Sequence, residues 1–290
     1  MYSANFDYHR ASSLSDAQRL LAANPGAKLL AGGHSLIPLM KLRLTTPSAV
    51  VDIGRIPELR GIARSGDAIR IGALTTHADI AASADLQKSA AALAEAAGLV
   101  GDPAVRSRGT IGGNIAHADP ASDLPTVLVA LNASIVAIGP SGERTIAADE
   151  FFTGIMSTLL ADNEVVTAIV VPVAVRGQGS AYVKFAHPAS RYAVIGAAAS
   201  VTMVGNKCSA ARIALGGLVP HATRARAVEE ALTGESLDAA AVANAAAQVS
   251  SDLGGDVLGD IFASSAYRTA VAPVYVKRAI AAAAARAGLA

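Results

Sequence analysis

Two glycine pairs set the strongest limit on how this chain folds. Gly32-Gly33 lies within Ala31-Gly-Gly-His-Ser35, and Gly112-Gly113 lies within Thr110-Ile-Gly-Gly-Asn114. Paired glycines let backbone N–H groups approach an oxygen-rich anion, and the hydroxyl groups of Ser35 and Thr110 add donors. Two such segments, far apart in the sequence, can close on one dinucleotide from both sides.

The alternative interpretation is that each pair is an ordinary turn, because glycine is the usual turn residue. The hydroxyl, amide and imidazole side chains beside both pairs argue against it. Neither pair matches the G-x-G-x-x-G fingerprint or the G-x-x-x-x-G-K-[ST] loop. A Rossmann fold and an NTPase are therefore not supported.

Helix and strand signals alternate in the first part of the chain. A helix is predicted over residues 15–23, strands over 28–31 and 49–53, and one or two helical turns over 34–42, which gives a β–turn–α–β unit. Further on, the pattern predicts a strand over 68–71, a helix from His77 with a Thr76–Asp79 capping box, and a helix over 89–99. Residues 124–130 fit a helix or a buried strand, and 133–138 and 164–171 fit strands.

A turn-rich segment, residues 172–180, marks the predicted domain boundary. Beyond it we expect three successive strands over residues 182–185, 193–203 and 209–215. Helices over 226–232, 237–249 and 264–287 follow, the last kinked or broken at Pro273. The predicted fold class is therefore α+β. It comprises a domain over 1–176, with subdomains of about 1–55 and 56–176, and a small α+β domain over 177–290 with a three-stranded sheet plus helices.

Composition excludes several function classes. The chain has 290 residues with 24 Lys+Arg against 23 Asp+Glu, so nucleic acid is not the expected partner. Its one cysteine, Cys208, excludes a disulfide framework, an iron–sulfur site and a thiolate zinc site within the chain. No metal site is expected. Only 16% of the residues are charged, which predicts surface buried against partner subunits.

No membrane span is expected, because the longest apolar-rich stretch, residues 124–138, contains Pro125 and Asn132. The N-terminus carries Asp7, His9 and Arg10 where a secretory peptide needs an apolar run. These two features predict a cytoplasmic protein.

The two glycine segments and Ala118-Asp-Pro-Ala-Ser-Asp-Leu-Pro125 resemble the medium, flavin-binding subunit of molybdenum hydroxylases. Carbon monoxide dehydrogenase medium subunits and the flavin part of xanthine dehydrogenase are the most similar in these motifs. The resemblance extends over essentially the whole chain. It implies a two-subdomain FAD-binding domain of the PCMH and vanillyl-alcohol-oxidase type, followed by the flavoprotein C-terminal domain.

The resemblance also implies the residues that hold FAD. The two glycine segments would bind its pyrophosphate and ribityl chain, mainly through backbone N–H groups. The acidic residue of the third motif, an apolar position, a basic position in Tyr182-Val-Lys-Phe185 and a tyrosine would lie at the flavin. The implied FAD-binding residues are Leu30, Ala31, Gly32, Gly33, His34, Ser35, Leu36, Thr110, Ile111, Gly112, Gly113, Asn114, Asp123, Val166, Lys184 and Tyr192.

Each of the last four residues has a plainer interpretation. Asp123 fits a helix cap, Lys184 a solvated surface charge, Tyr192 a ring in the core, and Val166 an ordinary strand residue in the core. Arg106 and Arg108 are predicted to be solvated, and Thr75, Thr76 and His77 to form a helix start rather than a site.

The implied function is electron transfer, so no catalytic acid or base is needed in this chain, because the isoalloxazine supplies the redox chemistry. The expected partners are a large subunit with the molybdenum cofactor and a small subunit with two 2Fe–2S clusters, arranged as a dimer of heterotrimers. The external acceptor would be NAD⁺, a quinone or dioxygen.

Two alternatives remain. One is a self-sufficient FAD oxidase with covalently bound flavin, since berberine-bridge-like oxidases attach flavin to a histidine placed like His34. The sequence Leu36-Ile-Pro38 and the second glycine motif favour non-covalent FAD. The other is a scaffold that has lost FAD, against which both intact glycine pairs argue.

Overall fold

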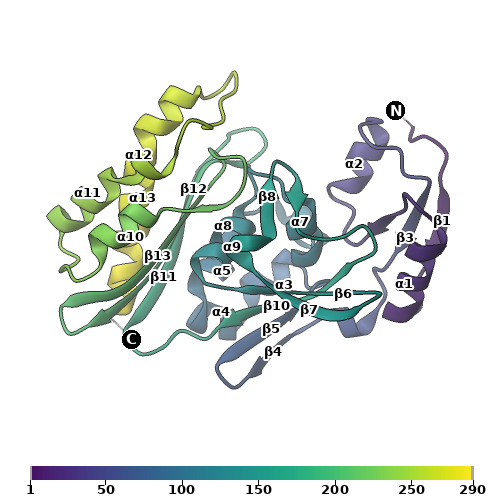
Figure 1. Cartoon of the computed structure of the whole chain (residues 1–290), viewed down its shortest axis with the longest axis horizontal. Coiled ribbons are helices and arrows are strands. Elements are labelled where there is room, and N and C mark those ends of the chain that lie inside the picture. Colours follow the sequence, from purple (N-terminus) through teal and green to yellow (C-terminus); the bar gives the residue numbers. More distant parts are fainter. Residues whose placement is uncertain (1, 289–290) are drawn as a thin grey trace.

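The computed structural model describes residues 2–288, which form three units in chain order (Figure 1). The first unit is a parallel sheet in the order β1–β3–β2. The apolar β3 is buried at its centre, and the polar β1 occupies one edge. The elements are β1 (Asp7–Arg10), α1 (Leu14–Ala23), β2 (Lys28–Leu30), α2 (Leu36–Lys41) and β3 (Ala49–Asp52). The predicted β–turn–α–β unit, β2–α2–β3, is confirmed.

The second unit is an antiparallel sheet in the order β4–β5–β10–β6–β7, accompanied by short helices. The predicted capping box is present, because Thr76 and Asp79 bond reciprocally at the start of α3. The elements are η1 (Pro57–Leu59), β4 (Ile62–Ser65), β5 (Ala68–Gly72), α3 (His77–Ala82), α4 (Ala84–Ser89), α5 (Ala91–Leu99), α6 (Pro103–Arg106), α7 (Ile111–His117), α8 (Asp123–Ala130), β6 (Ser134–Gly139), β7 (Gly142–Ala147), α9 (Ala148–Phe151), β8 (Phe152–Gly154), β9 (Ser157–Thr158) and β10 (Val165–Pro172).

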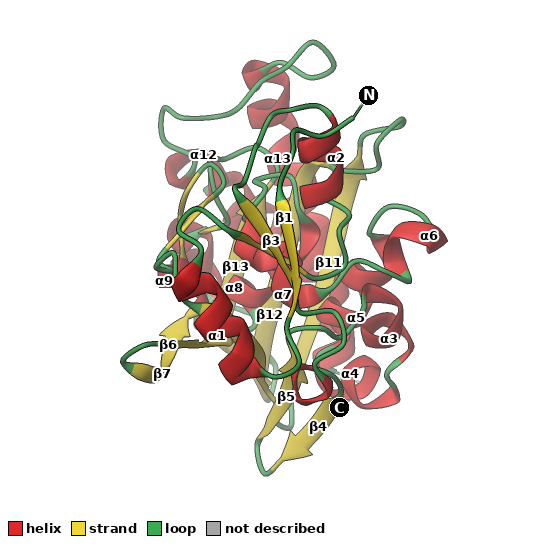
Figure 2. Ribbon diagram, turned by 90° about the vertical axis from the view of Figure 1, so that its right-hand side faces the viewer, coloured by secondary structure: helices red, strands yellow, loops and turns green. Residues whose placement is uncertain are grey.

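The third unit is an antiparallel sheet in the order β11–β12–β13–β14. Helix α13 packs along β11 and β12, while α5 and α8 of the second unit also contact this sheet, so β12 is buried through most of its length (Figures 1 and 2). The elements are β11 (Gln178–Ala186), β12 (Ala193–Val204), β13 (Lys207–Gly216), β14 (Thr223–Arg224), α10 (Arg226–Leu232), α11 (Ala239–Ala247), α12 (Val249–Asp252) and α13 (Ser265–Ala287).

Several sequence expectations need correction. The second glycine pair lies in the first turn of α7, which Thr110 caps, so it is not an ordinary turn. Residues 124–130 form a helix, and Pro125 is tolerated because it lies in the first turn of α8. The predicted helix over 89–99 starts after a break between α4 and α5. A short fourth strand, β14, extends the three long strands of the third sheet.

Helix α13 is continuous through Pro273, so the predicted break there is wrong. Pro273 costs α13 one backbone hydrogen bond, because proline has no N–H group, but packing of the helix compensates for this loss. The apolar face of α13, with Ala272, Val276 and Ile280, is fully buried against the third sheet. Burial of this face holds the helix together. Within residues 2–288, no helix combines the length and the apolar run that a membrane crossing requires.

One buried cation joins the parts of the third unit, and its removal should be costly. Arg268 of α13 donates to the carbonyl groups of Val194, Gly217 and Ala263 over 2.7–3.1 Å. Replacing Arg268 with alanine removes the donor to the buried Val194 and Gly217 carbonyls and the ion pair with Asp260, so the free energy of unfolding should fall by about 3 kcal/mol in urea titrations. The matched control is Lys277→Ala on the exposed face of the same helix. Equal losses in the two variants would contradict this role.

Candidate functional site

The first glycine segment presents a row of unused hydrogen-bond donors. After β2, the chain turns at Gly33, whose φ of +79° is in the left-handed region that glycine favours, and α2 begins at Leu36. Among residues 2–288, no partner exists for the backbone N–H groups of residues 32–35. Successive free amides of this kind attract an anion. The first glycine segment therefore keeps its donors available to a ligand.

The second glycine segment is different, because its backbone N–H groups are already used. Ile111 donates to the Thr75 carbonyl at 3.0 Å and Gly112 to the Ala73 carbonyl at 2.8 Å. Gly113 donates to Thr110 Oγ1 at 3.3 Å, and Asn114 to the Thr110 carbonyl at 3.0 Å. The expectation that both segments offer free amides therefore holds only for the first. The capped helix start uses the donors of the second.

The two glycine segments approach each other closely. A Cβ atom at Gly32 would lie 2.1 Å from the Arg108 carbonyl oxygen, and a Cβ atom at Gly113 would lie 3.7 Å from Ala31 Cβ. A Cβ atom at Gly112 would lie 2.5 Å from Ala73 Cβ. No side chain fits at Gly32 or at Gly112. Gly32 packs against the segment before α7, whereas Gly112 packs against Ala73 within the second unit and Gly113 makes only an ordinary contact with Ala31.

Between the units lies a cavity of about 730 Å³, which we call the interdomain cavity. Most of the sequence-predicted residues line it: Ala31, Gly32, Gly33, His34, Ser35, Leu36, Thr110, Gly112, Gly113, Asn114, Asp123, Val166 and Tyr192. Leu30 lines a smaller neighbouring cavity. Ile111 is fully buried in the core of the second unit, and Lys184 lies behind Asp123 rather than on the cavity wall.

Asp123 reaches the cavity from the first turn of α8 and is held by two buried side chains. Tyr182 Oη donates to Asp123 Oδ1 at 2.6 Å, and Lys184 Nζ donates to Oδ2 at 2.9 Å. Burial raises the pKa of Asp123, while the nearby ammonium and the tyrosine hydroxyl oppose this rise. Asp123 is therefore fixed in orientation. The interpretation of Lys184 as a solvated charge is wrong, because its side chain is only 2% exposed.

Lys184 also connects Asp123 to the segment that carries Tyr192. Its ammonium group donates to the carbonyl of Arg191 at 2.8 Å and to that of Leu99 at 3.0 Å. With Asp123, these acceptors occupy the three donors of the ammonium group. Tyr192 itself is 45% exposed at the edge of the cavity, so it is not a core ring. Lys184 therefore fixes the positions of Asp123 and of the segment before Tyr192.

Sequence reasoning missed parts of the wall. His77, assigned only to a helix start, both begins α3 and lines the cavity, and its buried Nδ1 has no partner within residues 2–288. Val100 and residues 156–158 and 160–162 also contribute. Their apolar and small polar types carry no motif that could have identified them. Arg106 is not simply solvated, because it donates to the carbonyls of Val100 and Gly101.

Comparisons with known proteins show the family of the chain. A family model described as "FAD binding domain in molybdopterin dehydrogenase" matches residues 4–174, and "CO dehydrogenase flavoprotein C-terminal domain" matches residues 180–283. The chain belongs to the FAD-binding medium subunits of the molybdopterin-dependent dehydrogenases. It is an oxidoreductase subunit whose cofactor is FAD.

The similarity to individual relatives spans the full chain. The carbon monoxide dehydrogenase medium chain of Hydrogenophaga pseudoflava is 44% identical, with 99% of each chain covered. The 6-hydroxypseudooxynicotine dehydrogenase complex subunit alpha of Paenarthrobacter nicotinovorans is 39% identical over 96% of this chain and 94% of the relative. A solved structure of the Hydrogenophaga carbon monoxide dehydrogenase superimposes with a TM-score of 0.95 at 44% identity, covering 99% of each chain. These relatives favour a subunit of a larger enzyme over a self-sufficient oxidase.

The buried imidazole predicts a loss of stability in acid. Burial, with a smaller contribution from His34, lowers the pKa of His77 from 6.5 to about 4. As the pH falls from 6.5 toward 4, the unfolded chain gains a proton that the native chain does not, so stability is lost over this window, by about 3 kcal/mol at most. Above pH 6.5 the effect is absent.

Urea titrations of the wild type and of His77→Leu across that pH range test this prediction. The variant should lose less stability on acidification, because it lacks the titrating group. The control is His221→Leu at a partly exposed position in the third unit, which should keep the wild-type pH dependence. If the wild type and His77→Leu show the same pH dependence, the prediction is wrong.

Proposed function

We propose that this chain is the electron-transfer subunit of a heterotrimeric molybdenum hydroxylase and that it holds FAD non-covalently in the interdomain cavity. The main support for this proposal is the row of backbone N–H groups without partners at residues 32–35, which lines the interdomain cavity of about 730 Å³. A pyrophosphate is an anion that such a row binds. The chemistry of the donor set therefore fits a dinucleotide cofactor.

We assign the remaining FAD contacts from the positions of the side chains. The Thr110 hydroxyl, which accepts from Gly113, keeps its own proton free for an oxygen of the cofactor. Asn114 is oriented by a 2.8 Å bond from Ser122 Oγ, and Asp123 by Tyr182 and Lys184. Val166 and Tyr192 add apolar surface for the flavin ring. Lys184 serves as a positioning residue, and Ile111 and Leu30 support the segments that carry the contacts.

When bound, FAD supplies the redox chemistry, accepting electrons from 2Fe–2S clusters of a small partner subunit and delivering them to an external acceptor. A large partner subunit carries the molybdenum cofactor. The dimer of heterotrimers, the cytoplasmic location and a boundary between the FAD-binding and C-terminal domains near residue 176 are parts of this proposal.

The first glycine pair should be required for cofactor retention. In Gly33→Val, a Cβ atom would lie 2.7 Å from Ile37 Cδ1 at a backbone angle that β-branched residues avoid, which would disrupt the row of amides. In Gly113→Val, the two glycine segments would be forced apart. Both variants should lose nearly all FAD while keeping their circular dichroism spectrum. Gly255→Val, where a Cβ atom meets nothing within 4 Å, is the control. Full flavin occupancy in both site variants would refute the assignment.

The mode of attachment and the partners are tested on the purified protein. We expect the absorption bands of oxidised flavin, release of all colour into the supernatant on acid precipitation, and co-purification of two further subunits containing molybdenum and iron. Colour that remains in the pellet would support a covalent bond at His34 and overturn non-covalent binding. A yellow protein that purifies alone and oxidises a substrate directly would overturn the electron-transfer function.

A further inference from the structure

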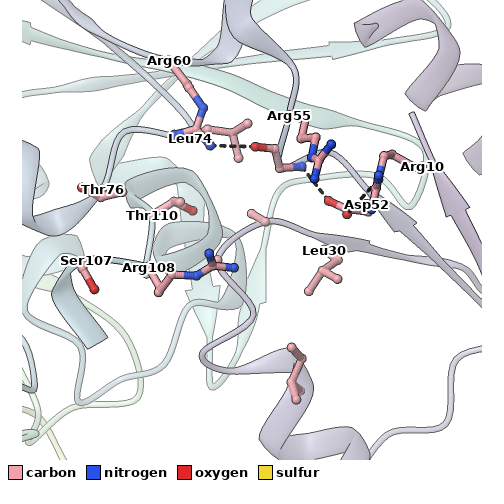
Figure 3. A pocket seen from close by; sticks show the side chains of 14 residues that line it. Arg10, Leu30, Asp52, Arg55, Arg60, Leu74, Thr76, Ser107, Arg108 and Thr110 are labelled. Atoms are coloured by element: carbon pink, nitrogen blue, oxygen red, sulfur yellow. Dashed lines mark hydrogen bonds and ion pairs between the residues drawn. The ribbon is translucent and has the colours of Figure 1, made fainter. Parts of the chain in front are cut away.

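A second cavity, of about 460 Å³, adjoins the interdomain cavity and shares Ala31, Gly32, Leu74 and Thr110 with it. We call it the arginine cavity, because Arg10, Arg55, Arg60 and Arg108 line it. Figure 3 shows Arg10 and Arg55 on the side of Asp52, and Arg108 across the opening from them. The four arginines come from three separate parts of the chain: the end of β1, residues 55–60, and the segment before α7.

The charges in the arginine cavity are not balanced by the chain itself. Among the described residues that line it, Asp52 is the only acidic one, and its oxygens already accept the Tyr8 hydroxyl at 2.6 Å and the Gly54 N–H at 2.8 Å. Arg10 lies 3.7 Å from the same carboxylate. Arg60 donates to the Gly54 carbonyl at 2.6 Å. Four guanidinium groups therefore face one carboxylate, in a chain whose formal net charge is only +1.

Two of the guanidinium groups are free. Among residues 2–288, the side chains of Arg55 and Arg108 have no hydrogen-bond or ion-pair partner, and both are exposed. A planar guanidinium offers several N–H donors in a fork that matches phosphate oxygens. Like charges gathered around one cavity repel each other unless an anion lies between them. The two unpaired guanidinium groups and the surplus positive charge together indicate that the matching ligand is a polyanion.

From this arrangement we propose that the arginine cavity binds the phosphate group of a small molecule other than FAD. Its volume lies in the range of small-ligand sites. Leu30, Ile37 and Leu74 give it an apolar wall that an inorganic ion cannot use, so the wall favours an organic phosphate such as a nucleotide. Of the free amides of residues 32–35, only that of Gly32 belongs to a residue that also lines the arginine cavity, while residues 33–35 line the interdomain cavity alone.

The site is tested by calorimetric titration of the flavin-loaded protein, in its assembly if partners co-purify, with ADP and with inorganic pyrophosphate. The double variant Arg55→Gln/Arg108→Gln should weaken ADP binding at least about tenfold, because two charged hydrogen bonds are lost. The matched control is Arg64→Gln/Arg70→Gln on β4 and β5, which removes the same charge from exposed positions outside the cavity. It should leave the ADP affinity within about twofold.

The outcomes are distinct. Tighter binding of ADP than of pyrophosphate supports a nucleotide ligand, and equal binding supports recognition of the phosphate groups alone. Absence of saturable binding by both probes overturns the proposal, as does equal weakening in the control variant. Loss of FAD from the Arg55/Arg108 variant would assign the cavity to the FAD site and overturn it too. Loss of FAD from Gly33→Val tests the proposed function separately, because Gly33 does not line the arginine cavity.

Discussion

The close approach of Gly32 to the backbone of Arg108 and Gly109 is the contact on which both cavities depend. A side chain at position 32 would overlap the Arg108 carbonyl group, so the first and second units meet backbone against backbone. A single methyl group at position 32 would push the two units apart. Because dispersion attraction falls off over small gaps, the packing between the units would then be lost. The interdomain cavity and the arginine cavity share this wall, with Gly32 and Thr110 contributing to both.

The two glycine pairs have unequal functions, although they look alike in the sequence. The first pair leaves amides without partners, since the chain turns at Gly33 before α2 begins. The second pair lies in a capped helix turn, where its amides are satisfied by Thr110, Ala73 and Thr75. The first pair therefore leaves donors available to a ligand, and the second lets the start of α7 pack tightly, with Gly112 against Ala73.

One buried ion pair and one partly exposed ion pair join the third unit to the second. Lys184 on β11 joins Asp123 of α8, the end of α5 and the segment before Tyr192. Arg286 of α13 pairs with Glu95 of α5 and donates to the Ser180 carbonyl at 2.6 Å. A buried charge that loses its partner is strongly destabilising. These pairs therefore fix the position of the C-terminal sheet relative to the interdomain cavity, which a purely apolar interface would not specify as tightly.

The sequence by itself determined the long apolar strands, most of the helices, the capping box of α3 and the glycine motifs, because each depends on neighbouring residues or on a local period. Motif resemblance added the residues that we propose to hold the flavin. Only the tertiary structure decided the rest. Strand β1 is polar and exists because it pairs with β3, α13 passes through Pro273 because its apolar face is buried, and Lys184 is buried by Asp123 and two carbonyl groups. The cavities and the gathering of four arginines depend on contacts between residues far apart in the chain, and no local pattern encodes such distances.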